Sequence, residues 1–271
     1  MKRSAFAGPY VVWMILSTVA PLLFVVYFAL TDRSGAFTLE NLAKFVDPIY
    51  LGVLWRSLYL AFYCTVICLL IGYPAAYFLA SKDFARNQAL YVLILLPMWM
   101  NFLLRTYAMM SVIEDTGMLN NFLKWLGLQP MEIIGTEGAV LLGMVYNFVP
   151  FMVLPIHTAL KKMNVRLIEA AEDLGAPPAQ VFYRVVLPLS LPGIVTGITM
   201  VFMPAVTTFA ISRLLGSGNF FLFGDIIERQ FLESNDWNFG SALSMVMAVL
   251  ILISMSLLNR VDPKKEGSGA Y

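Results

Sequence analysis

The chain has 271 residues, of which 59% are hydrophobic and 13% are charged, and its formal net charge is +1. Soluble globular domains carry about 25% charged residues, so this composition excludes an ordinary water-soluble protein. The near-neutral charge gives no reason to expect a nucleic-acid partner. We therefore expect a protein of the lipid bilayer.

Six runs without charged residues make up most of the chain. Each reaches or exceeds the roughly 18–20 residues that a helix needs to cross a bilayer. The first run follows Lys2 and Arg3, but it is much longer than the apolar part of a secretory signal, about 7–15 residues. The sequence thus predicts an all-α integral membrane protein with one transmembrane domain, 1–271. The predicted spans are 9–31, 57–81, 88–112, 138–160, 186–211 and 238–259.

Lysine and arginine predict the orientation, because cytosolic segments of membrane proteins carry an excess of both. With the N-terminus in the cytosol, the inner segments hold eleven of these residues and the outer segments hold six, and Arg105 lies in the third span. We therefore expect both termini on the cytosolic side of the inner membrane. The connection 161–186, between spans four and five, is expected on the same side.

This connection, which we call the docking loop (161–186), is charged and contains signals for a helix. Asn164 is a good N-cap, because its side chain can accept a bond from an open amide of the first turn. Gly175 suits the position after a helix, where the left-handed conformation is needed. The helix between them has about three turns. Pro177 and Pro178 cannot continue it but can begin a second short helix at an angle to the first.

The surface of the predicted helix indicates a protein partner rather than a lipid anchor. Leu167, Ala171 and Leu174 share one face, and acidic residues occupy the rest. Anionic lipids of the inner leaflet favour Lys and Arg on the polar face of an interfacial helix. An acidic helix at this place is therefore better explained by a protein that binds it.

Motifs for catalysis are missing. The chain has no G-x-x-x-x-G-K-[ST] phosphate loop, and His157 is its only histidine, so we expect neither an enzyme nor a metal site. Cys64 and Cys68 lie one turn apart in span two and are expected to pack as small apolar residues. If the protein performs work, another subunit has to supply the energy.

The docking loop resembles the "EAA" loop of ABC importer permeases. The resemblance rests on Glu169-Ala170-Ala171, on Gly175 four residues later, and on Leu187-Pro188; Val185 stands where that family most often has isoleucine. It implies a type I ABC importer permease fold, with short coupling helices that dock in a groove of a separate ATPase. It also implies that ATP is used by that partner, with no cofactor bound to this chain.

Three other segments resemble spermidine/putrescine permeases of the PotB type. They are Pro97–Tyr107, Gly117–Gly127 and Gln230–Trp237, and the similarity extends from Pro21 to about Asn259. The family implies polyamine import by a heterodimer with a homologous six-span subunit. It further implies two ATPase copies and an extracytoplasmic polyamine-binding protein.

A path for a flexible polycation should combine carboxylates with aromatic faces. Asp225 and Glu228 belong to an acidic group before span six, and Trp99 and Tyr107 flank Arg105 on span three. We expect the two acids and the two aromatic residues to line the path. For each of them, an ordinary surface or packing role is the alternative.

Arg105 and Pro97 are expected to have structural roles in the membrane. Pro97 should bend span three. A permanent cation would repel a polyamine, so Arg105 is expected to snorkel outward or to pair with Glu114 or Asp115.

Other readings remain open at this point. The same architecture can carry another cation or a small organic solute. A secondary transporter or a channel subunit would work without ATP and would not need the docking loop. An integral-membrane enzyme is the weakest alternative.

Overall fold

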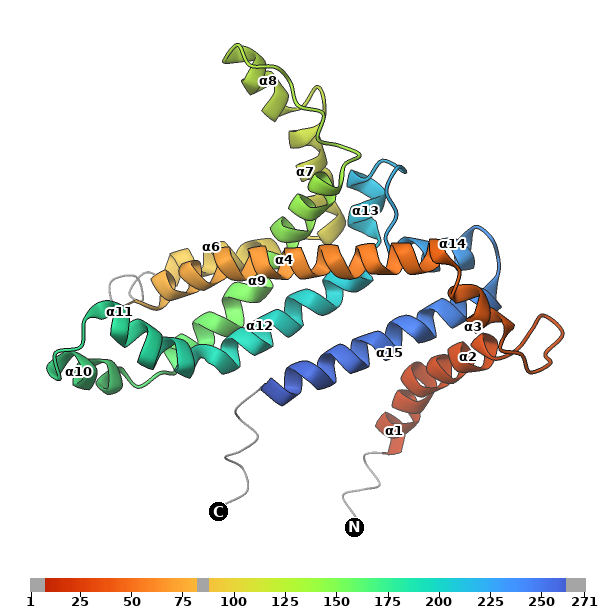
Figure 1. Ribbon diagram of the computed structural model, residues 1–271, viewed down its shortest axis with the longest axis horizontal. Helices are drawn as coiled ribbons and strands as arrows, with labels where there is room; N and C mark the ends of the chain where they lie inside the picture. Colours follow the sequence, from red (N-terminus) through yellow and green to blue (C-terminus); the bar gives the residue numbers. More distant parts are fainter. Residues whose placement is uncertain (1–7, 82–87, 262–271) are drawn as a thin grey trace.

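The computed structural model describes residues 8–81 and 88–261, and within these residues the chain is helical with no strand (Figure 1). A single isolated bridge joins Thr31 to Phe37. The prediction of an all-α membrane fold is therefore confirmed. The positive charges that predicted the orientation lie partly outside the described residues, namely Lys2, Arg3, Lys82, Arg86, Lys264 and Lys265.

Three long helices form the core, because their small residues allow close contact. They are α4 (Pro48–Ala80), α9 (Glu137–Lys161) and α12 (Leu187–Thr207). A Cβ atom added at Gly193 of α12 would lie 2.8 Å from the backbone oxygen of Pro155 in α9. The same atom at Gly197 would lie 2.7 Å from the Met152 sulfur. Small residues are how membrane helices approach one another without a hydrophobic driving force.

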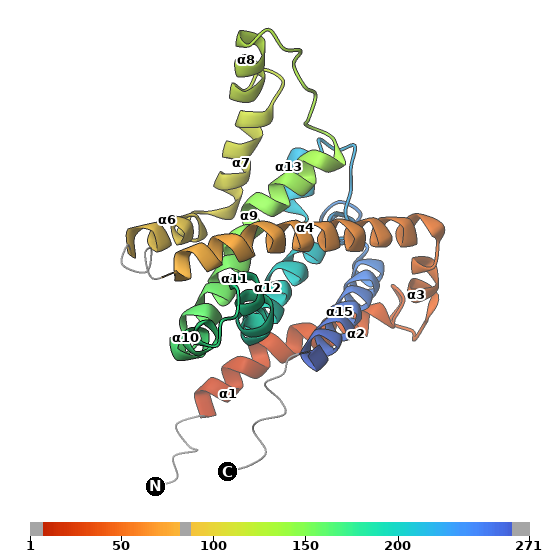
Figure 2. The same ribbon diagram turned by 60° about the vertical axis from the view of Figure 1, so that its left-hand side comes forward.

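The first span stands at the edge of this core. It comprises α1 (Gly8–Met14), a π-helical turn at Ile15–Val19 and α2 (Ala20–Ala29). In both views α2 lies beside α15 (Trp237–Val261) and away from α4 and α9 (Figure 2). In the most apolar 18-residue stretch of Tyr10–Ala29, no residue is buried by the rest of the chain.

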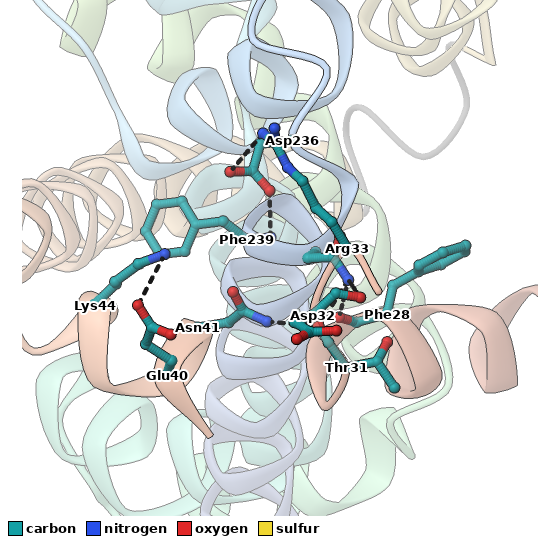
Figure 3. A network of polar contacts seen from close by, with 10 residues as sticks. Phe28, Thr31, Asp32, Arg33, Glu40, Asn41, Lys44, Asp236 and Phe239 are labelled. Carbon is teal, nitrogen blue, oxygen red and sulfur yellow. Dashed lines mark hydrogen bonds and ion pairs between the residues drawn. The ribbon is translucent and has the colours of Figure 1, made fainter. Parts of the chain in front are cut away.

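Two buried asparagines hold the end of α2, Asn238 from α15 and Asn41 from α3 (Glu40–Phe45). Figure 3 shows Asn41 beside Thr31. The Asn238 amide donates to the backbone oxygens of Phe28 and Thr31, at 3.1 and 2.7 Å. The Asn41 amide donates to the Thr31 oxygen at 2.9 Å. The last carbonyl groups of a helix have no partner within it, so these amides give α2 a defined end. Next to them, Arg33 and Asp236 form an ion pair at 3.7 Å.

Short helices connect the spans at the other places where the chain leaves the core. They are α3 (Glu40–Phe45), α8 (Met118–Trp125), α10 (Val165–Asp173), α11 (Pro178–Val181), α13 (Ala210–Leu215) and α14 (Phe223–Leu232).

Five described helices are long and apolar enough to cross a membrane, and a bent pair gives up to six crossings. The longest is α4, with 33 residues. At 1.5 Å per residue it measures about 50 Å, well beyond the roughly 30 Å of a hydrocarbon core. It starts at Pro48, earlier than the predicted span 57–81, and is longer than one perpendicular crossing requires.

Candidate functional site: the docking loop and the broken third span

The docking loop begins with the expected cap. The side-chain oxygen of Asn164 accepts a hydrogen bond from the Arg166 amide at 3.1 Å, and α10 follows at Val165. This bond satisfies one of the open amides of the first turn. The local sequence thus decides where the helix starts.

The end of α10 is a Schellman motif around Gly175. Gly175 has a φ of +80°. Its amide donates to the Glu172 oxygen at 2.8 Å, and the Ala176 amide donates to the Ala171 oxygen at 3.1 Å. These two bonds are the pair that defines this type of helix end.

α10 touches the core with only part of its apolar surface. Ile168 and Ala171 pack against the core, whereas Leu167 and Leu174 are 48% and 89% exposed. The expected face Leu167, Ala171 and Leu174 is therefore divided between the core and solvent. No residue of α10 is buried, so the chain itself does not account for the exposed leucines.

A cavity of ≈ 300 Å³ separates α10 from the ends of the core helices. Tyr77 of α4, Val186 before α12, and Glu169 and Glu172 of α10 are among the residues that line it. The contact of α10 with the bundle is thus incomplete along this side of the helix.

The second half of the docking loop differs from the expected separate short helix. Pro177 and Pro178 do begin α11, but the helix then runs without interruption from Pro178 to Thr207. A π-helical turn, Phe182–Val186, joins α11 to α12, and the Leu187 amide donates to the Phe182 oxygen. Pro188 has no amide hydrogen and would clash with the carbonyl four residues before it in a regular helix. The wider turn accommodates the proline, so Leu187 and Pro188 lie inside a long helix.

The predicted third span, 88–112, is broken into two helices. They are α6 (Gln88–Trp99) and α7 (Phe102–Ile113). The bend between Val92–Trp99 and Phe102–Trp125, which contains α7, is 104°. Pro97 lies in the last turn of α6, in agreement with the expected bend. The side chain of Asn101 accepts bonds from the Leu103 and Leu104 amides at 2.9 and 3.3 Å. This N-cap, which was not predicted from the sequence, starts a new helix at that point.

The two aromatic residues proposed for the path lie on either side of this break. Trp99, at the end of α6, is 85% exposed, and Tyr107, on α7, is 52% exposed. Both rings are therefore available to a molecule or a subunit outside the chain.

Arg105 does not behave as expected. Its side chain is buried, at 4% exposure, and its Nε and Nη1 atoms have no hydrogen-bond partner. It neither snorkels outward nor pairs with Glu114 or Asp115 in the described part of the chain. The reason is that the broken span turns this face of α7 inward, against α9 and α13.

The two outer carboxylates are bound within the chain. The Asp225 carboxylate is buried, and accepts a hydrogen bond from the Leu222 amide at 2.7 Å, at the start of α14. Burial raises the pKa of Asp225 to about 6, although a bond from the Ser212 hydroxyl opposes this shift. Glu228 pairs with Arg213 of α13 at 3.0 Å. In this structure both acids therefore hold α13 and α14 together.

Two other polar residues in the core were not identified from the sequence. The Ser57 hydroxyl accepts a bond from the buried Phe223 amide at 2.8 Å, which anchors α14 on α4. Asn147 of α9 is fully buried and donates to the Thr106 hydroxyl at 3.3 Å. A single amide within an otherwise apolar span is itself a signal, because polar groups inside membranes are costly and need a partner.

Comparison with known proteins identifies the family. The pattern described as "Binding-protein-dependent transport system inner membrane component" matches residues 69–267. The chain belongs to this family. It is 39% identical to the spermidine/putrescine transport system permease protein PotB of Salmonella typhimurium, with 92% of each chain covered. It is 40% identical to PotB of Haemophilus influenzae, with 92% of this chain and 90% of that one covered.

A solved structure shows the same fold. A chain from the bacterial alginate ABC transporter, in complex with an alginate pentasaccharide-bound periplasmic protein, superimposes with a TM-score of 0.78. The superposition covers 98% of this permease and 96% of that chain, at 17% identity. This likeness supports the ABC permease fold and carries no information about the cargo.

Proposed function

We propose that the chain is a transmembrane subunit of an ATP-driven polyamine importer. The main evidence for a polyamine cargo is the 39% identity, over 92% of both chains, to a permease named for spermidine and putrescine. The chain would form half of the translocation path. A homologous six-span subunit would form the other half.

The docking loop supports coupling to a separate ATPase. Glu169, Ala170 and Ala171 lie on α10, and Gly175 fixes its end. α10 exposes acidic residues and two leucines that the chain leaves uncovered. Because Leu187 and Pro188 continue the loop into α12 as one helix, a force on the loop can reach the core without a flexible joint. ATP would be hydrolysed by two copies of the partner, and no cofactor is proposed for this chain.

Counting crossings supports the proposed orientation. If the bent pair is one span, the chain crosses the membrane six times. Both termini then lie on one side, and so does the docking loop, which follows the fourth crossing. The excess of positive charge at these places assigns that side to the cytosol.

The outer face is the place for an extracytoplasmic polyamine-binding protein. The outer connections are acidic overall, which favours the approach of a polycation. Asp225 and Glu228 contribute to this field, while Trp99 and Tyr107 offer aromatic faces for cation–π contacts. Since the two acids are also engaged in the chain, we propose that they act on the cargo through their charge.

The test is polyamine-stimulated ATP hydrolysis by the complete transporter in liposomes, with the binding protein present. Spermidine or putrescine should stimulate hydrolysis, and a Glu169→Gln/Gly175→Val variant should abolish the stimulation. Glu132→Gln, in the outer connection before α9, is the matched charge control and should behave like the wild type. Hydrolysis that ignores polyamines would reject the proposed cargo. A chain that assembles with no ATPase would reject the coupling role.

A further inference from the structure

α7 is attached to the rest of the chain as a separate arm. It is joined to α6 through two residues, Met100 and Asn101, at a bend of 104° between Val92–Trp99 and Phe102–Trp125. Asn101 caps it, so α7 does not depend on α6 to continue its hydrogen bonds. Both views show α7 and α8 pointing away from the other long helices (Figures 1 and 2). These features describe a helix that can turn about its first residue.

The seat of this arm, by which we mean the contact of α7 with α9 and α13, contains polar groups that are incompletely satisfied. α7 also contributes apolar residues to the core, namely Phe102, Met110 and Ile113. Among the described residues, one side-chain hydrogen bond joins α7 to α9, from Asn147 to Thr106 at 3.3 Å. Beside Thr106, the Nε and Nη1 atoms of Arg105 lack an acceptor, and on α9 the Oδ1 atom of Asn147 lacks a donor. All three side chains are at least nine-tenths buried.

Two of the three guanidinium nitrogens, Nε and Nη1, are buried without an acceptor, and this weakens the seat. Buried polar groups without a partner destabilise the arrangement that buries them, and replacing a buried charge by an apolar residue of similar volume often stabilises a protein. A position of α7 that brings these two nitrogens to water or to an acceptor removes this cost. The seat is therefore the arrangement that α7 can leave most easily.

We propose that α7 is a hinged outer gate of the translocation path, and that Arg105 is the positioning residue that keeps this gate ready to leave its seat on α9 and α13. The proposal rests on the proposed transport function and deepens it. Trp99 precedes the hinge and Tyr107 follows it, so turning α7 changes the separation of the two exposed aromatic rings. The position of α7 would thereby determine how the two aromatic rings are placed for contact with the cargo.

The first test is the thermal stability of the assembled transporter in detergent. Arg105→Met keeps the length of the side chain and removes the charge, so it should raise the melting temperature and slow ATP-driven uptake at least fivefold. Arg105→Lys keeps the charge and should not raise the melting temperature. Lys124→Met, which removes an exposed charge that takes part in none of the ion pairs of the described residues, should leave the melting temperature within error of the wild type. A melting temperature lowered by Arg105→Met would show that the guanidinium supports the seat, and would overturn the proposal.

The second test locks the arm in its seat. Thr106→Cys and Asn147→Cys are combined in a Cys64→Ala/Cys68→Ala background and joined by oxidation or by a short bifunctional thiol reagent. With the link verified by mass spectrometry, uptake and substrate-stimulated ATP hydrolysis should be lost, and reduction of the disulfide should restore them. The single variant Thr106→Cys, treated in the same way, is the control. Unchanged hydrolysis in the linked transporter would refute the gate.

These readouts separate the gate from the cargo. The melting temperature needs no substrate, and hydrolysis can be stimulated by the loaded binding protein, whatever it carries. If polyamines fail to stimulate the wild type, the cargo proposal fails while the stability test of Arg105 still decides for or against the gate.

Discussion

Gly175→Ala changes the end of α10 through the backbone alone. Gly175 has a φ of +80°, and a Cβ atom added there would meet nothing within 4 Å. The left-handed conformation costs a residue with a Cβ about 1–2 kcal/mol. The two hydrogen bonds of the Schellman motif depend on that conformation. We therefore expect the substitution to shift Glu169–Gly175 and to leave the packing of the core unchanged.

If the ATPase binds this end of α10, the free energy needed to keep the left-handed conformation lowers the affinity of the ATPase for the permease. A penalty of about 1–2 kcal/mol corresponds to a roughly 5- to 30-fold change in an equilibrium, which is the upper limit for the loss of docking. Gly175→Asn should lose less, because asparagine tolerates the left-handed region. The assay is titration of the purified ATPase onto the reconstituted permease, together with ATP-driven uptake.

Gly218→Ala is the matched control. Gly218 has a φ of +75°, also with nothing within 4 Å of the added Cβ, but it lies between α13 and α14. The same local strain there should leave ATPase binding unchanged. Equal binding by Gly175→Ala and the wild type would refute the cap argument, and so would an equal loss with Gly218→Ala.

Three further predictions concern stability and the path. Burial raises the pKa of Asp225 to about 6, above the ordinary value of an aspartate, so the folded state binds this proton more tightly than the unfolded state. Stability should therefore fall as the pH rises from about 4 to about 6 and remain lower above it, and Asp225→Asn should flatten this part of the melting-temperature profile. Gly193→Ala should destabilise the protein by about 1–3 kcal/mol, because the added Cβ would press on the α9 backbone. Gly52→Ala is the control in the same melting assay. It should not destabilise the protein, because its added Cβ would meet nothing within 4 Å. Trp99→Ala should lower substrate-driven uptake without loss of assembly, since the ring is 85% exposed; normal uptake would remove Trp99 from the path.

The local features of the docking loop could be derived from the sequence because they depend on neighbouring residues. Asn164 caps the helix that follows it, and Gly175 takes the left-handed conformation that its missing Cβ permits. The same holds for the all-α membrane class, since a run of about 20 apolar residues has to satisfy its backbone bonds within a helix when it lies in lipid.

What the sequence by itself determined is thus the set of apolar helices, the caps of α10 and the family resemblance. Only the tertiary structure decided which way α7 runs after the bend in the third span, and that Arg105 and Asp225 turn inward. It also decided that Pro188 continues a long helix through a π-helical turn. The physical reason is that the direction of α7 and the burial of the Arg105 and Asp225 side chains depend on contacts between helices, and periodicity carries no information about such contacts.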